Sequence, residues 1–423
     1  MPAVPPTTTS PPPSGAKYNQ LTPPAKPAAG KPDQPHGRPA LETEAFALGS
    51  FLARWSGAVV YDLSASESAT LKLSALLAMA QPDDEARWRG LDLDYPHPRG
   101  ASWLRAEIAT RYRGLDPDHI VCCAGAQEGL ACVARAILDP GDHAIVVLPI
   151  YQPSERAVTS ICAATGIALQ DRGTWRLDID SLAASVRPDT RLVLINFPNS
   201  PTGAQIDPDT LAALVALCRR HGLWLVNDEV YRLTAVDPSA GPPPIAEIYE
   251  RGISINSLSK GHGLAGLRVG WIACQDRALL AKVLLAKSGL SSCLAAPNEV
   301  LAHIALRAEA RIVARNRSIA EANLGLLQAC LNRHSQVFEP ARPNNLAFFA
   351  PRVLLAPDAG DFATHLVAAA GVLVLPWTLW RSPLAEVPAD RLRIGLGGAD
   401  MGHALAALDD YLIHHVAPAG AQP

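Results

Sequence analysis

Short apolar runs alternate with amphipathic stretches through the middle of the chain. Runs in which every residue is apolar are typical of strands buried on both faces, whereas apolar residues three or four positions apart indicate helices. The predicted strands lie at 120–123, 144–148, 192–195 and 223–226. Asp207 and Pro208 begin a predicted helix, and Gly222 ends it. This spacing predicts an α/β domain with a mostly parallel sheet.

The pattern changes on both sides of this central region. A helical pattern over 40–55 and a strand-like run over 59–63 precede it. Helices dominate from residue 297 onward, and a last amphipathic helix is predicted over 402–416. The predicted strands of this C-terminal region lie at 346–349, 372–375 and 392–396. A mixture of helices and short strands predicts a second, smaller α+β domain.

These patterns predict four parts of the chain. The first is a disordered tail, because its many prolines and few aromatic residues cannot form a core. The second is an N-terminal segment that packs with the small domain, and the third and fourth are the large and small domains. The predicted bounds, in this order, are 1–42, 43–75, 76–305 and 306–423.

Composition and charge exclude several classes of protein. The chain has 37 basic and 40 acidic residues, and a net charge of −3 argues against a nucleic-acid partner. The longest apolar run, 366–380, contains Gly371 and Pro376 and is too short and too broken to span a membrane. Eight cysteines without C-x-x-C spacing, and no visible signal peptide, predict buried free thiols in the cytoplasm.

One stretch, 254–271, carries the chemistry on which the rest depends. Lys260 lies among small and apolar residues, with glycines at 261, 263, 266 and 270 and no carboxylate within six residues on either side. Burial in such a setting disfavours an ammonium ion, as a Schiff-base lysine requires. The hydroxyl of Ser257 and the guanidinium of Arg268 can hold a phosphate. The alternative is a glycine-rich turn with a solvated lysine.

Four more groups of polar or small residues follow predicted strands, where ligands bind in α/β sheets. Residues 125–127 suit an anion site at a helix N-terminus, although a tight turn would look the same. Tyr151 can offer a flat face to an aromatic ligand or can be a half-buried core residue. The loop 196–203 is rigid and polar. Asp228 ends a buried strand and is therefore expected to meet a cation.

Three of these stretches resemble one family when they are taken together. They are P-N-S-P-T-G at 198–203, D-E-V-Y at 228–231 and S-L-S-K-G-H-G-L-A-G-L-R at 257–268. In this order they resemble the fold-type I enzymes that use pyridoxal 5′-phosphate (PLP), specifically the class I/II aminotransferases. The resemblance covers about 67–397. It implies the aspartate aminotransferase-like fold, an enzyme acting on an L-amino acid, and PLP as the cofactor.

The resemblance also implies a role for each matching residue. Lys260 would form a Schiff base with PLP and move the Cα proton, Asp228 would hold the ring nitrogen, and Tyr231 would bind the 3-oxygen. The cofactor would be further held by Tyr151 stacking on its ring, and by Ala126, Gln127, Ser257 and Arg268 binding its phosphate.

Two other residues are implied to bind the partner subunit's cofactor and the substrate. Tyr95 resembles the tyrosine that reaches the phosphate of the neighbouring subunit, which implies a homodimer. Arg393 resembles the arginine that grips the substrate carboxylate. One position departs from the family: Ser200 stands where an asparagine usually precedes Pro-Thr-Gly. The contact to the 3-oxygen is therefore open between Ser200, Asn199 and Asn196.

A narrower resemblance provides a second hypothesis for the reaction. Residues 63–68, 93–100 and 291–299 are similar to a branch that includes capreomycidine synthase-like enzymes. The implied activity is a PLP-dependent elimination and ring closure on an arginine-derived amino acid in natural-product biosynthesis. Ser66 and Glu67 would then touch the substrate, with Glu67 meeting a guanidinium or only capping its loop. A third hypothesis, a PLP-binding regulator, would require a DNA-binding domain, and the N-terminal region shows no helix-turn-helix pattern.

Overall fold

A computed structural model describes residues 46–238, 241–339, 343–354 and 358–416. The predicted tail over 1–42 lies outside the described residues. The chain from Ala45 onward forms one unit by its internal contacts. The division of this unit near residue 305 stays a prediction.

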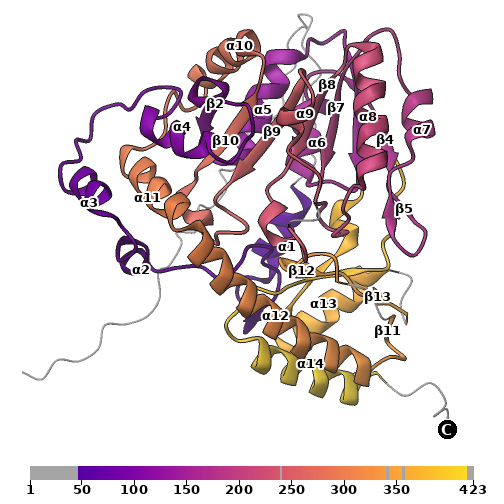
Figure 1. The fold of residues 1–423 in the computed structure, drawn as a ribbon. Helices are drawn as coiled ribbons and strands as arrows, with labels where there is room; N and C mark the ends of the chain where they lie inside the picture. Colours follow the sequence, from indigo (N-terminus) through magenta and orange to yellow (C-terminus); the bar gives the residue numbers. More distant parts are fainter. Residues whose placement is uncertain (1–45, 239–240, 340–342, 355–357, 417–423) are drawn as a thin grey trace, which may run out of the picture. The chain divides into compact units, whose positions relative to one another are not determined.

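A seven-stranded sheet forms the centre of the fold (Figure 1). Only β10 runs antiparallel to its neighbours, so the sheet is mostly parallel, as predicted. In spatial order the strands are β2 (Ile120–Cys123), β10 (Gly270–Cys274), β9 (Gly252–Ser257), β8 (Trp224–Asp228), β7 (Thr190–Asn196), β3 (His143–Leu148) and β4 (Ala163–Ala168). All four predicted strands are present. Of the other three strands, β9 coincides with a short β-prone run at 253–255, whereas β10 and β4 were not predicted. Strand β4 is an edge strand of alanine, threonine and glycine with few β-formers.

The continuous apolar runs arise because both faces of the sheet are covered by helices. In β2, Val121 and Cys123 face one hydrophobic core while Ile120 and Cys122 face another. The first core also contains residues of α5 (Ala126–Ile137), α6 (Gln152–Thr159) and α10 (Arg277–Ser288). On the opposite face lie α4 (Ser102–Ala109), α7 (Ile179–Ala184), α8 (Pro208–His221), α9 (Ile245–Ile248) and α11 (Ala296–Arg307).

Helix α8 has the caps that its sequence predicts. The side chain of Asp207 accepts a hydrogen bond from the backbone N–H of Thr210 at 2.9 Å. Pro208 is the first helical residue, where its missing N–H costs nothing. Gly222 follows the helix in the left-handed conformation, with φ of 65°. Local sequence therefore sets both ends of this helix.

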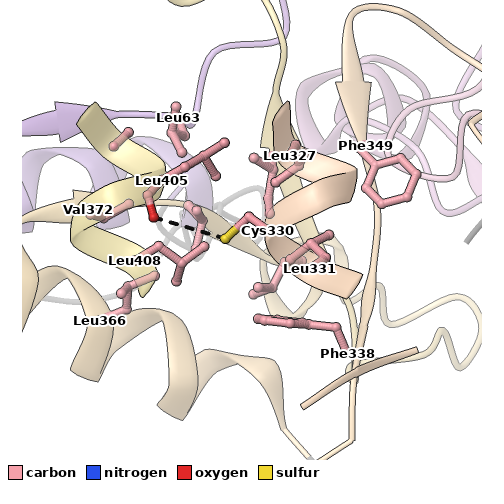
Figure 2. Close-up of a cluster of buried hydrophobic side chains, with 14 of the residues drawn as sticks. Leu63, Leu327, Cys330, Leu331, Phe338, Phe349, Leu366, Val372, Leu405 and Leu408 are labelled. Carbon is pink, nitrogen blue, oxygen red and sulfur yellow. Dashed lines mark hydrogen bonds between the residues drawn. The ribbon is translucent and has the colours of Figure 1, made fainter. Parts of the chain in front are cut away.

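The C-terminal region builds a second core around α12 (Glu309–Arg333), α13 (Ala359–Ala370) and α14 (Met401–His415). Figure 2 shows Leu327, Cys330 and Leu331 of α12 facing Leu405 and Leu408 of α14. A three-stranded sheet of β12 (Phe348–Phe349), β16 (Leu392–Gly395) and β15 (Leu375–Pro376) lies beside them. The strand predicted over 59–63 is only the two-residue β1 (Tyr61–Asp62), which pairs with β14 (Val372–Leu373).

The remaining elements are short. They are α1 (Ala47–Trp55), α2 (Leu73–Leu77), α3 (Pro82–Arg89), β5 (Gln170–Asp171), β6 (Trp175–Arg176), β11 (Phe338–Glu339) and β13 (Arg352–Val353). None of the helices in the described residues is both long and apolar enough to cross a membrane.

The cysteines behave as their apolar surroundings predict. All eight are free thiols, and only Cys293 is not fully buried. Burial disfavours the thiolate and raises the pKa of Cys122, and likewise that of Cys218, to about 12. These thiols are therefore inert components of the core.

Candidate active site

The five predicted ligand-binding groups converge at one edge of the sheet. Strands β2, β9, β8, β7 and β3 run parallel to one another, so their carboxyl ends meet at the same edge. This arrangement places the loops that follow them around a common space. The loop after β1 and strand β16 add residues from the two ends of the chain.

Lys260 lies in the loop after β9, with its ammonium group facing the loop after β1. Its Nζ donates a hydrogen bond to Ser66 Oγ at 2.9 Å and lies 3.5 Å from Glu67 Oε2. The neighbouring sequence predicted surroundings without a carboxylate for Lys260, and this prediction is therefore wrong. Glu67 is 193 residues away along the chain, and tertiary packing brings it to the lysine.

Tyr231 completes this group from the loop after β8. Its hydroxyl donates to Ser66 Oγ at 3.0 Å, and its ring centroid lies 5.6 Å from Lys260 Nζ. The ring of Phe348 packs edge-on against it, with centroids 5.5 Å apart. Ser66 therefore accepts hydrogen bonds from both Tyr231 and Lys260, which fixes the lysine nitrogen over the carboxyl ends of the central strands.

Asp228 ends β8 and is buried, with 8% of its surface exposed. The backbone N–H of Val230 donates to its Oδ1 at 3.3 Å. Burial is the main cause that raises its pKa to about 6. No lysine, arginine or histidine of the described residues lies within ion-pair distance of Asp228, and the charge of Lys260 lowers its pKa only from farther away. A cationic ligand group would fill the role of the cation expected from the sequence.

We expect the Asp228→Asn variant of the PLP-free protein to be more stable than the wild type at pH 7. Between pH 3.8 and about 6, the folded protein retains a proton that the unfolded chain has lost, so this carboxyl group reduces stability as pH rises. The full penalty, up to about 3 kcal/mol, applies above pH 6 and is removed in the variant. Urea denaturation at several pH values measures the difference in the free energy of unfolding between the variant and the wild type. A stability gain that is equal at pH 4 and pH 7 would contradict this origin.

Arg393 lies in β16 and is buried, with 5% of its surface exposed. Its Nη2 donates to the carbonyl oxygen of Ser64 at 2.8 Å, and its Nη1 donates to Ser200 Oγ at 3.3 Å. The ring of Trp380 lies 4.9 Å from its guanidinium carbon. Burial lowers the pKa of Arg393, and its Nε has no hydrogen-bond partner among the described residues. A buried guanidinium paired only with neutral groups is a binding site for an anion.

A second candidate anion site lies at the start of α5. Gly125 precedes the helix with φ of 87°, and an added Cβ would collide with the guanidinium of Arg268. The first backbone N–H groups of the helix, at Ala126 and Gln127, point out of its N-terminus. The side chain of Gln127 is engaged with the carbonyl of Pro153 at 3.1 Å, so Gln127 offers its backbone here. Buried Ser257 ends β9 on the same edge.

We expect Gly125→Ala to weaken PLP binding at least about tenfold. A side chain at this φ costs about 1–2 kcal/mol. The added methyl group also displaces Arg268 from the phosphate cradle, which is the predicted phosphate site formed by Gly125, Arg268 and the N-terminus of α5. Gly114→Ala is a matched control, because Gly114 also has a positive φ, of 76°, but nothing lies within 4 Å of its added Cβ. Titration of each apoprotein with PLP, followed by tryptophan fluorescence, compares the two dissociation constants. Equal weakening in both variants would contradict a phosphate cradle at Gly125.

The structure gives the polar side chains of the loop 196–203 different partners, while the contact to the 3-oxygen stays a prediction. The side chain of Asn199 donates to the carbonyl of Pro149 at 3.0 Å and accepts from Thr202 Oγ1 at 2.6 Å. The side chain of Asn196 donates to the Asp228 carbonyl at 2.7 Å. Ser200, by contrast, meets Arg393. Both asparagines therefore maintain the loop, and Ser200 is the residue that turns toward the site.

Tyr151 begins α6 and is 36% exposed. Its ring packs edge-on against Phe46, with centroids 5.7 Å apart. Burial raises the pKa of Tyr151, and the charges of Arg393 and Arg268 oppose this shift. Tyr151 thus lies within reach of both arginines and keeps one side open, as a ring that stacks on a ligand needs.

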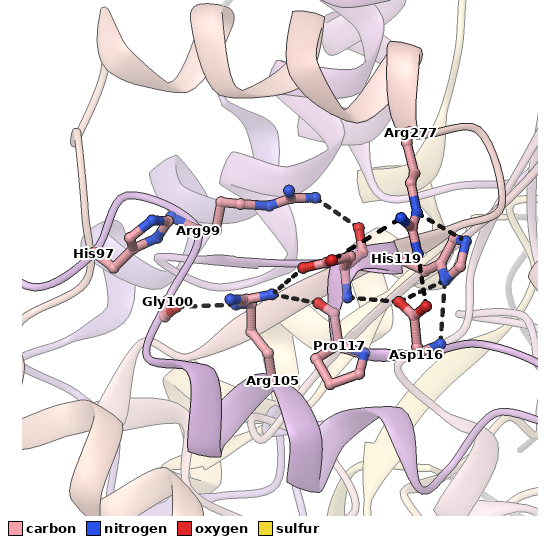
Figure 3. A network of polar contacts seen from close by, with 9 residues as sticks. His97, Arg99, Gly100, Arg105, Asp116, Pro117, His119 and Arg277 are labelled. Atoms are coloured by element: carbon pink, nitrogen blue, oxygen red, sulfur yellow. Dashed lines mark hydrogen bonds and ion pairs between the residues drawn. The ribbon is translucent and has the colours of Figure 1, made fainter.

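Tyr95 is not part of the group of residues around Lys260. It is 88% exposed and lies in the loop before α4. The base of that loop is held by a polar network (Figure 3), in which Arg99 donates to the carbonyl of Asp118 at 2.6 Å. In the same network Arg105 bonds Gly100, and Arg277 pairs with Asp116. The loop is anchored at its base while its tyrosine is exposed.

Sequence patterns missed two contributors to the site. Ser64 acts through its backbone carbonyl, and no side-chain pattern marks a carbonyl. Phe348 touches both Tyr231 and Arg393, but it lies in a short apolar run that is indistinguishable from ordinary core. No cluster of three or more histidine, cysteine or acidic residues suited to a metal ion occurs among the described residues.

A family model described as aminotransferase class I and II matches residues 59–408 of the chain. The chain belongs to this family. The family and the fold together make it a PLP-dependent enzyme, as the motifs predicted. The solved structure of a PLP-dependent aminotransferase from Streptococcus suis is 26% identical and superposes with a TM-score of 0.81, covering 88% of this chain and 98% of that one.

Two curated relatives of this member of the class I/II aminotransferases are a transaminase and a synthase. The arginine–pyruvate transaminase AruH of Pseudomonas aeruginosa is 36% identical over 186 residues, which cover 42% of this chain and 47% of the relative. Capreomycidine synthase of Streptomyces vinaceus is 30% identical over 332 residues, covering 75% of this chain and 80% of the relative.

Proposed function

We propose that this protein transfers the amino group of an L-amino acid, with Lys260 as the residue that binds PLP covalently. The proposal depends on one observation: an ammonium, a buried carboxylate and a buried guanidinium converge at one sheet edge, and the last two have no ion-pair partner among the described residues. An amino-acid substrate bound to PLP supplies the missing charges.

The residues of the site fit PLP. The cradle of Gly125, Arg268 and the α5 N-terminus suits a phosphate, because it combines backbone N–H groups with a guanidinium and has no room for a side chain at Gly125. Asp228 would hold the ring nitrogen, since a buried carboxyl group without a cation favours a protonated nitrogen. Tyr151 would lie against the ring, and Ser257 would help to hold the phosphate. When bound, PLP withdraws electrons from the substrate Cα and makes its proton acidic.

The chain's own residues would then position and move a proton. Lys260, once its nitrogen is released, would take the proton from the substrate Cα and return it to another atom. Ser66 and Tyr231 would hold that nitrogen in place, as their hydroxyls do here. Arg393 would bind the substrate carboxylate and orient the Cα hydrogen toward Lys260, with Ser200 steadying the guanidinium.

A second reaction, elimination followed by ring closure, has its own support. The match to capreomycidine synthase spans more of this chain than the match to the transaminase. Ser200 in place of the usual asparagine would also change the hydrogen bonding to the 3-oxygen of bound PLP. Both reactions begin with the same proton transfer, so the same lysine, aspartate and arginine serve either one.

Mixing the purified, PLP-loaded protein with single amino acids tests the proposal. A transaminase converts its cofactor to the pyridoxamine form with one donor and stops, which appears as a loss of the visible absorbance band. An enzyme of the second type regains the original band and continues to turn over without a keto-acid acceptor. Turnover without any keto acid would therefore replace transamination with the second reaction.

Assembly and compartment complete the proposal. A homodimer is supported by exposed Tyr95 on its anchored loop, where it could reach a partner subunit's phosphate. Light scattering on the purified protein measures its molar mass and so tests whether it is a dimer. A reducing compartment such as the cytoplasm is supported by eight free cysteines.

A further inference from the structure

We infer that Glu67 selects amino acids whose side chain carries a positive charge, either a guanidinium or an ammonium. This inference rests on the proposed function, because it assumes that Arg393 holds the substrate carboxylate. It concerns a different part of the substrate, the end of the side chain. Three features of Glu67 support it: its backbone is held in place, its side chain is negatively charged, and its loop also contacts Arg393.

The backbone around Glu67 is held on both sides. The N–H of Ser68 donates to the carbonyl of Lys260 at 3.0 Å, and the N–H of Gly395 donates to the carbonyl of Leu63 at 2.7 Å. An added Cβ at Gly397 would collide with the carbonyl of Glu67 itself. The loop after β1 is thus pressed against β16 and the Lys260 loop, and the Glu67 side chain starts from a fixed point in the active site.

Glu67 differs from Asp228, the other carboxyl group of the site, in where it lies. Asp228 is buried beneath the site, at the end of β8, whereas the side chain of Glu67 is 39% exposed. In this structure Glu67 Oε2 faces the ammonium of Lys260 at 3.5 Å. In the proposed function that nitrogen is bonded to PLP before the substrate arrives and is a neutral base once it is released, so no free ammonium stays beside Glu67 when the Cα proton is taken. A carboxylate in this position favours another cation.

Glu67 lies in the loop after β1, and Arg393 of β16 contacts the same loop. Ser64 accepts a hydrogen bond from Arg393, and Glu67 follows three residues later in the chain. Burial lowers the pKa of Arg393, and the negative charge of Glu67 opposes part of this lowering, so the two charged groups act on one another. A substrate held by its carboxylate at Arg393 can therefore present a side-chain cation to Glu67. Its carboxylate then faces the positive charge of Arg393, and its side-chain cation faces the negative charge of Glu67.

Capping of the loop does not require the charge of Glu67. The backbone N–H of Ser66 donates to Glu67 Oε2 at 3.2 Å, and the amide oxygen of a glutamine accepts the same bond. Glu67→Gln therefore keeps the size and the cap while it removes the charge. This substitution separates a structural role from recognition of a cation.

The experiment compares arginine with citrulline, its neutral analogue of nearly equal shape. The wild type is expected to prefer arginine by about tenfold or more, both in kcat/KM and in binding measured by calorimetry on the PLP-loaded protein. Glu67→Gln is expected to lose this preference by weakening arginine alone, so that the ratio falls to within about threefold. The control Glu85→Gln lies on α3, paired only with exposed Arg89, and should keep the wild-type ratio.

Two results would overturn the inference. One is a wild type that binds arginine and citrulline with equal affinity. The other is a Glu67→Gln variant whose affinities for arginine and citrulline fall by the same factor, which would mean that Glu67 positions Lys260 or the loop. The proposed function fails differently: the cofactor spectrum would then respond to no amino acid. In that case calorimetry still decides whether Glu67 distinguishes the charged from the neutral ligand.

Discussion

Replacing Lys260 with alanine is expected to lower turnover by at least about 10⁴-fold. Loss of a positioned general base alone costs about 10²–10⁴-fold, and this lysine is also the proposed point of covalent attachment. The variant should still bind PLP through the phosphate cradle, because Gly125 and Arg268 are unchanged. Its cofactor should therefore be removable by dialysis, whereas that of the wild type becomes fixed after borohydride reduction.

The direct measurement is mass spectrometry of the reduced protein. The wild type should carry the added mass on the peptide that contains Lys260, and the Lys260→Ala variant should carry none. Lys282→Ala is a suitable control, because Lys282 is exposed on α10 and should leave both labelling and turnover unchanged. Labelling of another lysine in the wild type would refute the assignment.

Replacing Arg393 with alanine is expected to lower kcat/KM by about 30- to 5000-fold. This range corresponds to about 2–5 kcal/mol, the cost of removing one partner from a buried, charge-assisted pair. The structure places the expected value toward the upper part of this range, since Arg393 is buried and Ser200 and Ser64 are neutral. Arg268, the other arginine of the site, is proposed to hold the phosphate and is therefore not expected to replace Arg393.

Steady-state kinetics and PLP titration should be measured together for this variant. The PLP dissociation constant should stay near the wild-type value, because the arginine is proposed to bind substrate and not cofactor. Arg352→Ala serves as the control, since Arg352 is exposed and pairs with Asp390 and Glu339 at the surface. An unchanged KM and kcat in Arg393→Ala would mean that another group anchors the carboxylate.

Several parts of the fold follow from local sequence alone. The strand β2 was predictable because Ile120 to Cys123 face two hydrophobic cores, which requires an uninterrupted apolar run. The bounds of α8 were predictable because Asp207 and Gly222 act on the nearest backbone groups. The two-residue β1 was not, because β14, more than 300 residues later, decides how much of the run is paired.

The polar loop at 196–203 illustrates a limit of sequence reasoning. Asn199 and Ser200 are adjacent, both are polar, and either can in principle contact a ligand. In the fold Asn199 bonds the carbonyl of Pro149, 50 residues away, while Ser200 turns to Arg393, 193 residues away. Which of two neighbours faces a site depends on partners that the local pattern does not contain.

The sequence by itself determined the family and the cofactor, and it singled out the residues proposed to carry the common chemistry, because each of the motifs that contain Lys260, Asp228 and Arg268 is a contiguous run. Only the tertiary structure decided what surrounds these residues. Ser66 and Glu67 reach Lys260 because backbone hydrogen bonds hold the loop after β1 against the Lys260 loop and β16. The charge that we propose to select the substrate therefore arises from packing between distant segments, which no local pattern encodes.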